Sequence, residues 1–214
     1  MCSEKARLQL VAGAYIGEIS AICILKFSHS VSPPPYLLAG SGSELLLYDL
    51  SSPNSKLVRS VHVFRGIRIH GVSYLEEKTK LTSMSSFPAV LSLSLVVFGE
   101  KRVKLFLLHF KFCGVSGTLL DITFEHTDPL PTFSHWVLDV AFLPGDYETK
   151  LIAIGCSDNS VCIWDVSFQK LVIKVQHPEK CLLYSMRLWG DNLQNLRIAS
   201  GTIFNEIDKH LEIE

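Results

Sequence analysis

The chain has 214 residues, of which 48% are hydrophobic and 19% are charged. This composition is typical of a folded protein with a substantial core, and it excludes a disordered or low-complexity chain. The formal net charge of -1 excludes nucleic-acid binding driven by an overall basic field, but it leaves local basic patches open.

Cysteine usage and hydropathy indicate a reducing compartment. None of the six cysteines forms a C-x-x-C pair, and four lie inside apolar runs, so we expect buried thiols and neither zinc ligands nor disulfides. Cys156 and Cys162 could still face each other across a hairpin, which leaves one disulfide geometrically open. The N-terminus lacks the long apolar core of a signal peptide, and the apolar residues 87–99 are too short to span a bilayer. We therefore expect a cytosolic or nuclear chain, and we assign it to the cytoplasm.

Short apolar segments separated by turns predict strands from the beginning of the chain. A first unit has strands at residues 19–27, 36–40, 44–50 and 56–64, and Tyr48-Asp49 closes its third strand. A second unit has strands at residues 67–74, 89–99, 102–110 and 119–124. Loop insertions are expected at residues 33–35 and 76–88. No segment carries a convincing helical period, so the sequence predicts an all-β protein.

A third unit has strands at residues 136–143, 151–156, 161–166 and 171–175, and a fourth begins at residues 181–189 and 196–201. The hairpin of residues 151–166 is apolar on both faces of both strands, whereas a surface hairpin alternates apolar and polar residues. We therefore expect it to lie between two neighbouring sheets. Within it, the Asp158 carboxylate can bond backbone N–H groups of the turn, and Asn159 tolerates a left-handed φ.

The same hairpin resembles a WD repeat. Gly155, Asp158, Trp164 and Asp165 stand where such a repeat has its small-residue strand, its turn aspartate and its closing Trp-Asp. Each WD repeat forms a four-stranded blade of a β-propeller, and Trp164 would pack against the next blade. The alternative is an isolated hairpin with a chance Trp-Asp pair.

Glycines at the ends of the second strands mark the repeat: Gly40, Gly99, Gly155 and Gly201. We therefore predict a partial WD-repeat β-propeller with about three blades and half of a fourth. The predicted blades cover residues 16–64, 65–125, 134–176 and 181–214. A polar tail is expected after residue 207 in place of another strand. Because a closed ring needs more blades, residues 1–214 would be the amino-terminal portion of a larger propeller.

Polar residues near the third unit have no obvious catalytic arrangement. Thr132-Phe133 take the place of the Gly-His pair that often bonds onward in a WD repeat, so the network of Asp158 and Trp164 should be incomplete. No carboxylate groups with His109, His126 or His135 in the sequence. Asp139 is either a catalytic or channel-lining carboxylate or, as we favour, an acceptor for backbone N–H groups.

Several short sequence motifs, taken in order, resemble those of the amino-terminal propeller of the WD repeat-containing protein six family. They are Leu37-Leu38-Ala39-Gly40, Leu47-Tyr48, Arg68-Ile69-His70-Gly71, Val96-Val97-Phe98-Gly99, residues 134–139, Gly155 with Asn159-Ser160-Val161, Cys181 and residues 199–205. The resemblance implies a non-catalytic scaffold. It would bind a tRNA ribose methyltransferase and help to place tRNA for 2′-O-methylation of the anticodon wobble nucleotide.

The alternative is a generic WD-repeat adaptor, such as a ubiquitin-ligase substrate receptor or a trafficking scaffold, because fold alone does not define function. An enzyme is disfavoured, since no nucleophile elbow, Walker loop or G-x-G-x-x-G occurs. No metal or cofactor is expected.

One basic cluster stands out in the sequence. Arg65 and Arg68, with Lys56 and Arg59 nearby and His70 beside them, could contact tRNA phosphates or could form an ordinary solvated surface.

Overall fold

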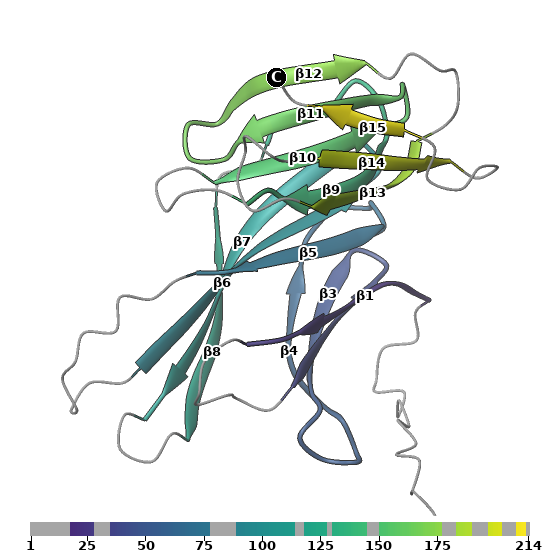
Figure 1. Ribbon diagram of the computed structural model, residues 1–214. Helices are drawn as coiled ribbons and strands as arrows, with labels where there is room; N and C mark the ends of the chain where they lie inside the picture. Colours follow the sequence, from purple (N-terminus) through teal and green to yellow (C-terminus); the bar gives the residue numbers. More distant parts are fainter. Residues whose placement is uncertain are drawn as a thin grey trace, which may run out of the picture.

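The computed structural model describes residues 18–27, 35–77, 89–113, 118–127, 130–144, 150–176, 183–189, 197–202 and 209–212. Within these residues the chain forms fifteen β-strands and no helix (Figure 1). The strands make three four-stranded sheets and one three-stranded sheet, and every pairing between neighbouring strands is antiparallel. The predicted all-β class is confirmed.

Strands follow one another in each sheet in the order of the sequence. The first sheet contains β1 (Ile19–Leu25), β2 (Tyr36–Ser41), β3 (Glu44–Asp49) and β4 (Lys56–His62). The second contains β5 (Gly71–Glu76), β6 (Ala89–Gly99), β7 (Arg102–Phe112) and β8 (Leu119–His126). The third contains β9 (Val137–Phe142), β10 (Leu151–Cys156), β11 (Ser160–Asp165) and β12 (Lys170–Gln176). The fourth contains β13 (Leu183–Trp189), β14 (Arg197–Thr202) and β15 (Lys209–Glu212).

The first strands of successive sheets touch one another: β1 contacts β5, β5 contacts β9, and β9 contacts β13. The fourth strands lie on the far side of each sheet, at the end of the order β1-β2-β3-β4 and its equivalents. The sheets therefore share an inner edge and diverge outwards, as the blades of a propeller do.

Apolar side chains fill the spaces between successive sheets. One core cluster joins the first and second sheets through residues such as Leu38, Leu47 and Phe106. In the third sheet, neighbouring residues turn to opposite sides: Ile152 packs toward the second sheet and Leu151 toward Met186 of the fourth. This alternation follows from the two-residue period of a strand. The prediction that the hairpin of residues 151–166 is covered on both faces is confirmed.

Trp164 packs on the side opposite to the one we predicted. It joins the cluster between the second and third sheets, where its ring centroid lies 6.2 Å from that of Phe133. Trp164 shares its face with Cys162, while Ile163 turns toward the fourth sheet. The strand register therefore directs Trp164 to the preceding sheet and not to the next one.

Two predicted segments differ from the structure. Residues 67–70 precede β5 and do not belong to it, because the Ile69 N–H donates to the Gly42 carbonyl (2.8 Å) and the His70 N–H to the Phe98 carbonyl (2.8 Å). Lys209–Glu212 form β15, paired with β14, where we expected a polar tail. Backbone pairing needs no apolar side chain, so polarity concealed this strand. The predicted insertions at residues 33–34 and 78–88, and Cys2 and Cys181, lie outside the described residues.

Glycines allow the loop after β4 to cross the ends of two sheets. At Gly40, an added methyl carbon would lie 2.7 Å from Cγ2 of Ile69. At Gly99, it would overlap the backbone carbonyl oxygen of Arg68. A side chain at either position would push away the loop that connects the first sheet to the second.

Gly99→Ala should therefore lower the free energy of unfolding by about 2 kcal/mol or more, because the obstacle at this position is backbone that cannot rotate away. Urea denaturation measures the change. Gly42→Asn is the control: Gly42 has a φ of +57° with open space around it, and asparagine adopts that conformation readily. An Ala variant at Gly99 as stable as the wild type would contradict the proposed crossing.

Candidate functional site

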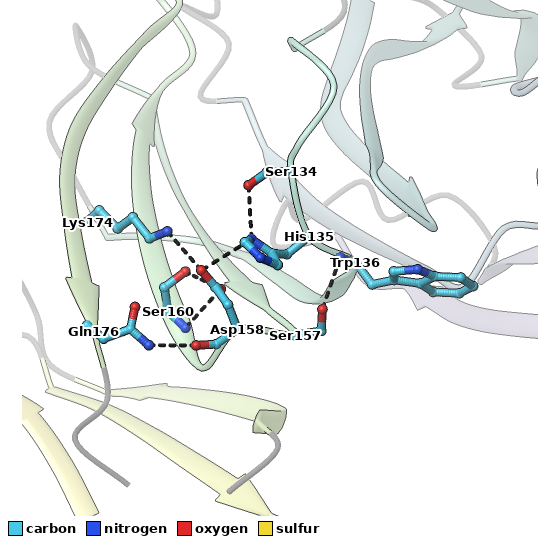
Figure 2. A network of polar contacts seen from close by, with 8 residues as sticks. All are labelled: Ser134, His135, Trp136, Ser157, Asp158, Ser160, Lys174 and Gln176. Atoms are coloured by element: carbon cyan, nitrogen blue, oxygen red, sulfur yellow. Dashed lines mark hydrogen bonds and ion pairs between the residues drawn. The ribbon is translucent and has the colours of Figure 1, made fainter. Parts of the chain in front are cut away.

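Asp158 is the centre of a polar network in the turn between β10 and β11 (Figure 2). Its Oδ1 accepts hydrogen bonds from the Ser160 hydroxyl (2.6 Å) and the Ser160 N–H (3.3 Å). Its Oδ2 lies 2.9 Å from Lys174 Nζ and 3.3 Å from His135 Nδ1. The Asp158 carbonyl accepts a bond from Gln176 Nε2 (2.5 Å). The side chain thus ties this turn to β12 and to the segment before β9.

The turn has the local geometry that the sequence predicted. Asn159 has a φ of 61°, in the left-handed region, and its N–H donates to the Cys156 carbonyl (3.0 Å). Burial alone would raise the pKa of Asp158, but the hydrogen bonds from Ser160 and Lys174 outweigh it and lower the pKa to about 2. The carboxylate is therefore charged at neutral pH and acts as a fixed acceptor.

The sequence led us to expect no carboxylate beside His109 or His135 and no histidine in the network of Asp158, and the structure corrects both expectations. The carboxylate of Asp158 does group with a histidine, and His109 also pairs with Glu125 (3.3 Å). The network around Asp158 is therefore not missing its histidine: Ser134-His135 supply it two residues later than Thr132-Phe133. The spacing of residues in the sequence does not reveal that this histidine reaches Asp158 from a position two residues later.

The expectation that the polar network of Asp158 does not reach Trp164 agrees with the structure. The Trp164 indole nitrogen is buried and has no hydrogen-bond partner among the described residues. The indole acts as a packing group against Phe133 and the apolar side chains around it. The network around Asp158 therefore does not extend to Trp164.

The remaining predicted motif residues lie in strands or at strand ends. Gly155 pairs with Val161 and Asp139 at the centre of the third sheet. Asp165 is buried, and its Oδ1 accepts the Phe168 N–H (3.1 Å). Tyr48 is buried in β3 at the position equivalent to Trp164 in β11, one residue before the strand end.

Two aspartates hold backbone groups. Asp49 Oδ1 accepts the Ser51 N–H (2.7 Å) and so closes the turn after β3. Asp139 accepts the Val140 N–H at Oδ1 (2.9 Å) and the Met186 N–H at Oδ2 (2.7 Å). The second bond links β9 to β13, so Asp139 is the backbone acceptor that we favoured.

Cys23, Cys156 and Cys162 form no disulfide, and Cys156 and Cys162 are buried. These two thiols form a hydrogen bond and no disulfide. The bond, donated by Cys156, lowers the pKa of Cys162, with Lys174 acting in the same direction. It raises the pKa of Cys156, as does burial.

The basic residues do not form one cluster. Arg59 bridges to β8, where it bonds Asp121 Oδ1 and the Ile122 carbonyl, both at 3.0 Å. Lys56 begins β4, at the end opposite to the loop that carries Arg65 and Arg68. Arg65 and Arg68 are exposed, and Arg68 pairs with Glu18 (3.0 Å).

His70 contacts a residue that the sequence did not indicate. Its ring stacks on the indole of Trp136, with centroids 5.7 Å apart and planes 23° from parallel. Trp136 is 47% exposed and immediately precedes β9. The sequence shows only that Trp136 follows His135, and its exposure and its contact with His70 appear in the structure alone.

Other kinds of site are not seen in the described part of the chain. It holds no group of three or more His, Cys, Asp or Glu side chains arranged to bind a metal ion. It also holds no helix long and apolar enough to cross a membrane.

The fold and the turn network define a class of protein. Successive four-stranded antiparallel sheets meet at an inner edge, and a turn aspartate precedes a closing Trp-Asp, so the chain is part of a WD-type β-propeller. No family model matches the chain. It is, however, similar to the tRNA (34-2'-O)-methyltransferase regulator WDR6, at 28% identity over 174 residues of the mouse protein and 26% over 178 residues of the human protein.

These matches cover 80% of this chain and support the WDR6-like family relationship that the sequence words predicted. The chain spans 14% of the length of these relatives.

Solved structures show the same fold. The BBS1N domain in complex with ARL6DN matches 91% of this chain and 50% of its own, with a TM-score of 0.51 and 13% identity. Raptor from Chaetomium thermophilum matches 94% of this chain and 17% of its own, with a TM-score of 0.51 and 12% identity. At such identities the likeness extends to the fold alone.

Asp158→Asn should reduce the free energy of unfolding at pH 7 by about 1 to 2 kcal/mol, because it removes the charge that Lys174 and Ser160 stabilise. The pKa of about 2 lies below the ordinary 3.8, so this contribution is complete above about pH 4 and is lost as the pH falls toward 2. Urea denaturation from pH 7 to pH 3 should show the two proteins converging.

Lys174→Gln serves as the companion variant. Because it removes the other half of the same pair, the double variant should lose less stability than the two single variants together. A difference between wild type and Asp158→Asn that stays constant with pH would contradict the charge-based explanation.

Proposed function

We propose that this chain is a non-catalytic scaffold segment of a WDR6-like regulator of tRNA 2′-O-methylation. It would bind the methyltransferase and help to present the anticodon wobble nucleotide. The observation that carries this proposal is the match to WDR6 regulators over 80% of the chain. The roles of Asp158, Asp139 and Asp165 support it, since each carboxylate is engaged in holding a turn or a strand.

We also propose how the chain divides into blades and in which cell compartment it lies. We divide the chain into blades at residues 16–64, 65–125, 134–176 and 181–214. We place it in the cytoplasm, which the reduced thiols of Cys23, Cys156 and Cys162 support. Its partners would be the methyltransferase and, through that enzyme or directly, tRNA, with no membrane and no cofactor.

Affinity purification of the tagged full chain from cells, followed by mass spectrometry, should recover a tRNA 2′-O-methyltransferase. Deletion of the gene should lower ribose methylation at tRNA position 34, because the relatives are regulators of that reaction. A tagged propeller of unrelated sequence is the control for non-specific capture. Recovery of ubiquitin-ligase subunits without a methyltransferase would favour the generic WD-repeat adaptor.

We also propose that Arg65, Arg68 and His70 face tRNA. Changing Arg65 and Arg68 to Gln should weaken association with a tRNA transcript and flatten its salt dependence, by about 0.7 to 0.9 in log-log slope for each phosphate that the protein no longer neutralises. Arg59→Gln is the matched control, because its guanidinium is engaged by Asp121 and Ile122. Equal affinities and slopes for wild type and the double variant would contradict this assignment.

A further inference from the structure

Two stacked rings, one before β5 and one before β9, form a flat aromatic unit at the end of the sheets that carries the β6–β7 and β10–β11 turns. His70 immediately precedes β5 and Trp136 immediately precedes β9. Their ring centroids are 5.7 Å apart and their planes differ by only 23°. Because Trp136 is 47% exposed, a large part of the indole remains open to solvent beyond the contact with His70.

The backbone beneath this pair is firmly held. The Trp136 N–H donates to Ser157 Oγ (3.1 Å), and the Trp136 carbonyl accepts the Ser157 N–H (2.8 Å). The His70 N–H donates to the Phe98 carbonyl (2.8 Å). Figure 2 shows the Trp136 indole directed away from Asp158 and its polar partners. The ring is therefore anchored at its base but takes no part in the network beside it.

Exposure distinguishes Trp136 from the other tryptophan whose surroundings are described. Trp164 packs within the core between two sheets, whereas Trp136 keeps 47% of its surface in water. A preorganised aromatic face of this kind offers a stacking partner large contact area with little loss of conformational freedom.

Two segments next to the ring pair carry cationic residues. The turn between β6 and β7 lies beneath it, because the Phe133 N–H bonds the Lys101 carbonyl (2.9 Å) and the Val137 N–H bonds the Glu100 carbonyl (2.5 Å). Lys101 and Arg102 are exposed at this turn. The loop that leads to His70 adds Arg65, whereas Arg68 of the same loop is paired with Glu18.

Carboxylates on this side are fewer or already engaged. Glu18 pairs with Arg68 (3.0 Å), and Asp158 pairs with Lys174 (2.9 Å). Glu100 is the remaining acidic residue of the β6–β7 turn, next to the two cations Lys101 and Arg102. Outside these ion pairs, the exposed cations Arg65, Lys101 and Arg102 outnumber Glu100, so the surroundings of the ring pair favour an anionic partner.

We propose that the His70–Trp136 pair is a stacking platform for an unpaired RNA nucleobase, with Lys101 and Arg102 bonding the flanking phosphates. Flat aromatic rings beside cations are the combination with which proteins hold single-stranded nucleic acids. A peptide of aspartate and glutamate alone would use the cations but has no aromatic ring to stack on the open indole face. The inference rests on the proposed function for the source of the RNA, an unpaired stretch of tRNA.

The test measures binding of a fluorescein-labelled single-stranded 12-mer RNA and of a labelled tRNA transcript to the full chain by fluorescence anisotropy. Trp136→Ala should weaken binding by about fivefold to a hundredfold, as expected when one base can no longer stack. Trp136→Phe should fall between wild type and Ala, because a smaller ring retains part of the stack. Lys101→Glu with Arg102→Glu should weaken binding and flatten its salt dependence.

Phe168→Ala is the matched control. Phe168 is also an exposed aromatic residue beside a cation, with Lys170 Nζ 5.5 Å from its ring centroid, but it lies in the β11–β12 turn at the opposite end of the strands. It should bind RNA as the wild type does. Circular dichroism checks that each variant is folded, and if Trp136→Ala is not, the charge variant decides the outcome.

Unchanged RNA affinity in folded Trp136→Ala and in the charge variant would overturn the proposal, as would an equal loss in Phe168→Ala. So would a Trp136-dependent preference for a polyglutamate peptide over RNA. Recovery of the methyltransferase by Trp136→Ala, alongside weakened RNA binding, would support it. Failure of the wild-type chain to recover any methyltransferase would refute the proposed function and leave the RNA measurement to decide the platform separately.

Discussion

Packing between sheets is the constraint on which the rest of this structure depends. The central strands of the three four-stranded sheets are largely apolar on both faces, so each of these sheets needs cover on either side to remove those faces from water. The sheets consequently stack about a common inner edge, where β1, β5, β9 and β13 touch in turn. This arrangement leaves the turns and connecting loops at the strand ends as the surfaces available for recognition.

Polar side chains reinforce the contacts between these sheets at defined points. Asp139 holds a backbone N–H of β13, and Arg59 reaches from β4 to β8. Lys150, before β10, pairs with Glu77, after β5 (2.6 Å). Each of these bonds joins one sheet to the next. Apolar packing is not directional and would by itself allow neighbouring sheets to slide past each other. The loops at the strand ends are thus carried on a rigid frame, as a recognition surface requires.

Prediction of the site succeeded where the chemistry is local. Asp158 and Asn159 shape a turn through their immediate neighbours, so their roles follow from residue type and position. The role of His135 did not follow, because its contact with Asp158 joins the segment before β9 to the turn between β10 and β11. The prediction of the sheet against which Trp164 packs was wrong for a similar reason, because the position of β11 between the neighbouring sheets decides which one the indole faces.

The sequence by itself determined the all-β class, most of the strands, the two-sided apolar hairpin and the similarity to WDR6. These features depend on side-chain periodicity, turn chemistry and residue order, which act along the chain. Only the tertiary structure decided that His70 stacks on Trp136 and that Arg59 is engaged while Arg65 is exposed. Those relations join residues of different sheets, and they depend on how the sheets twist and pack against one another.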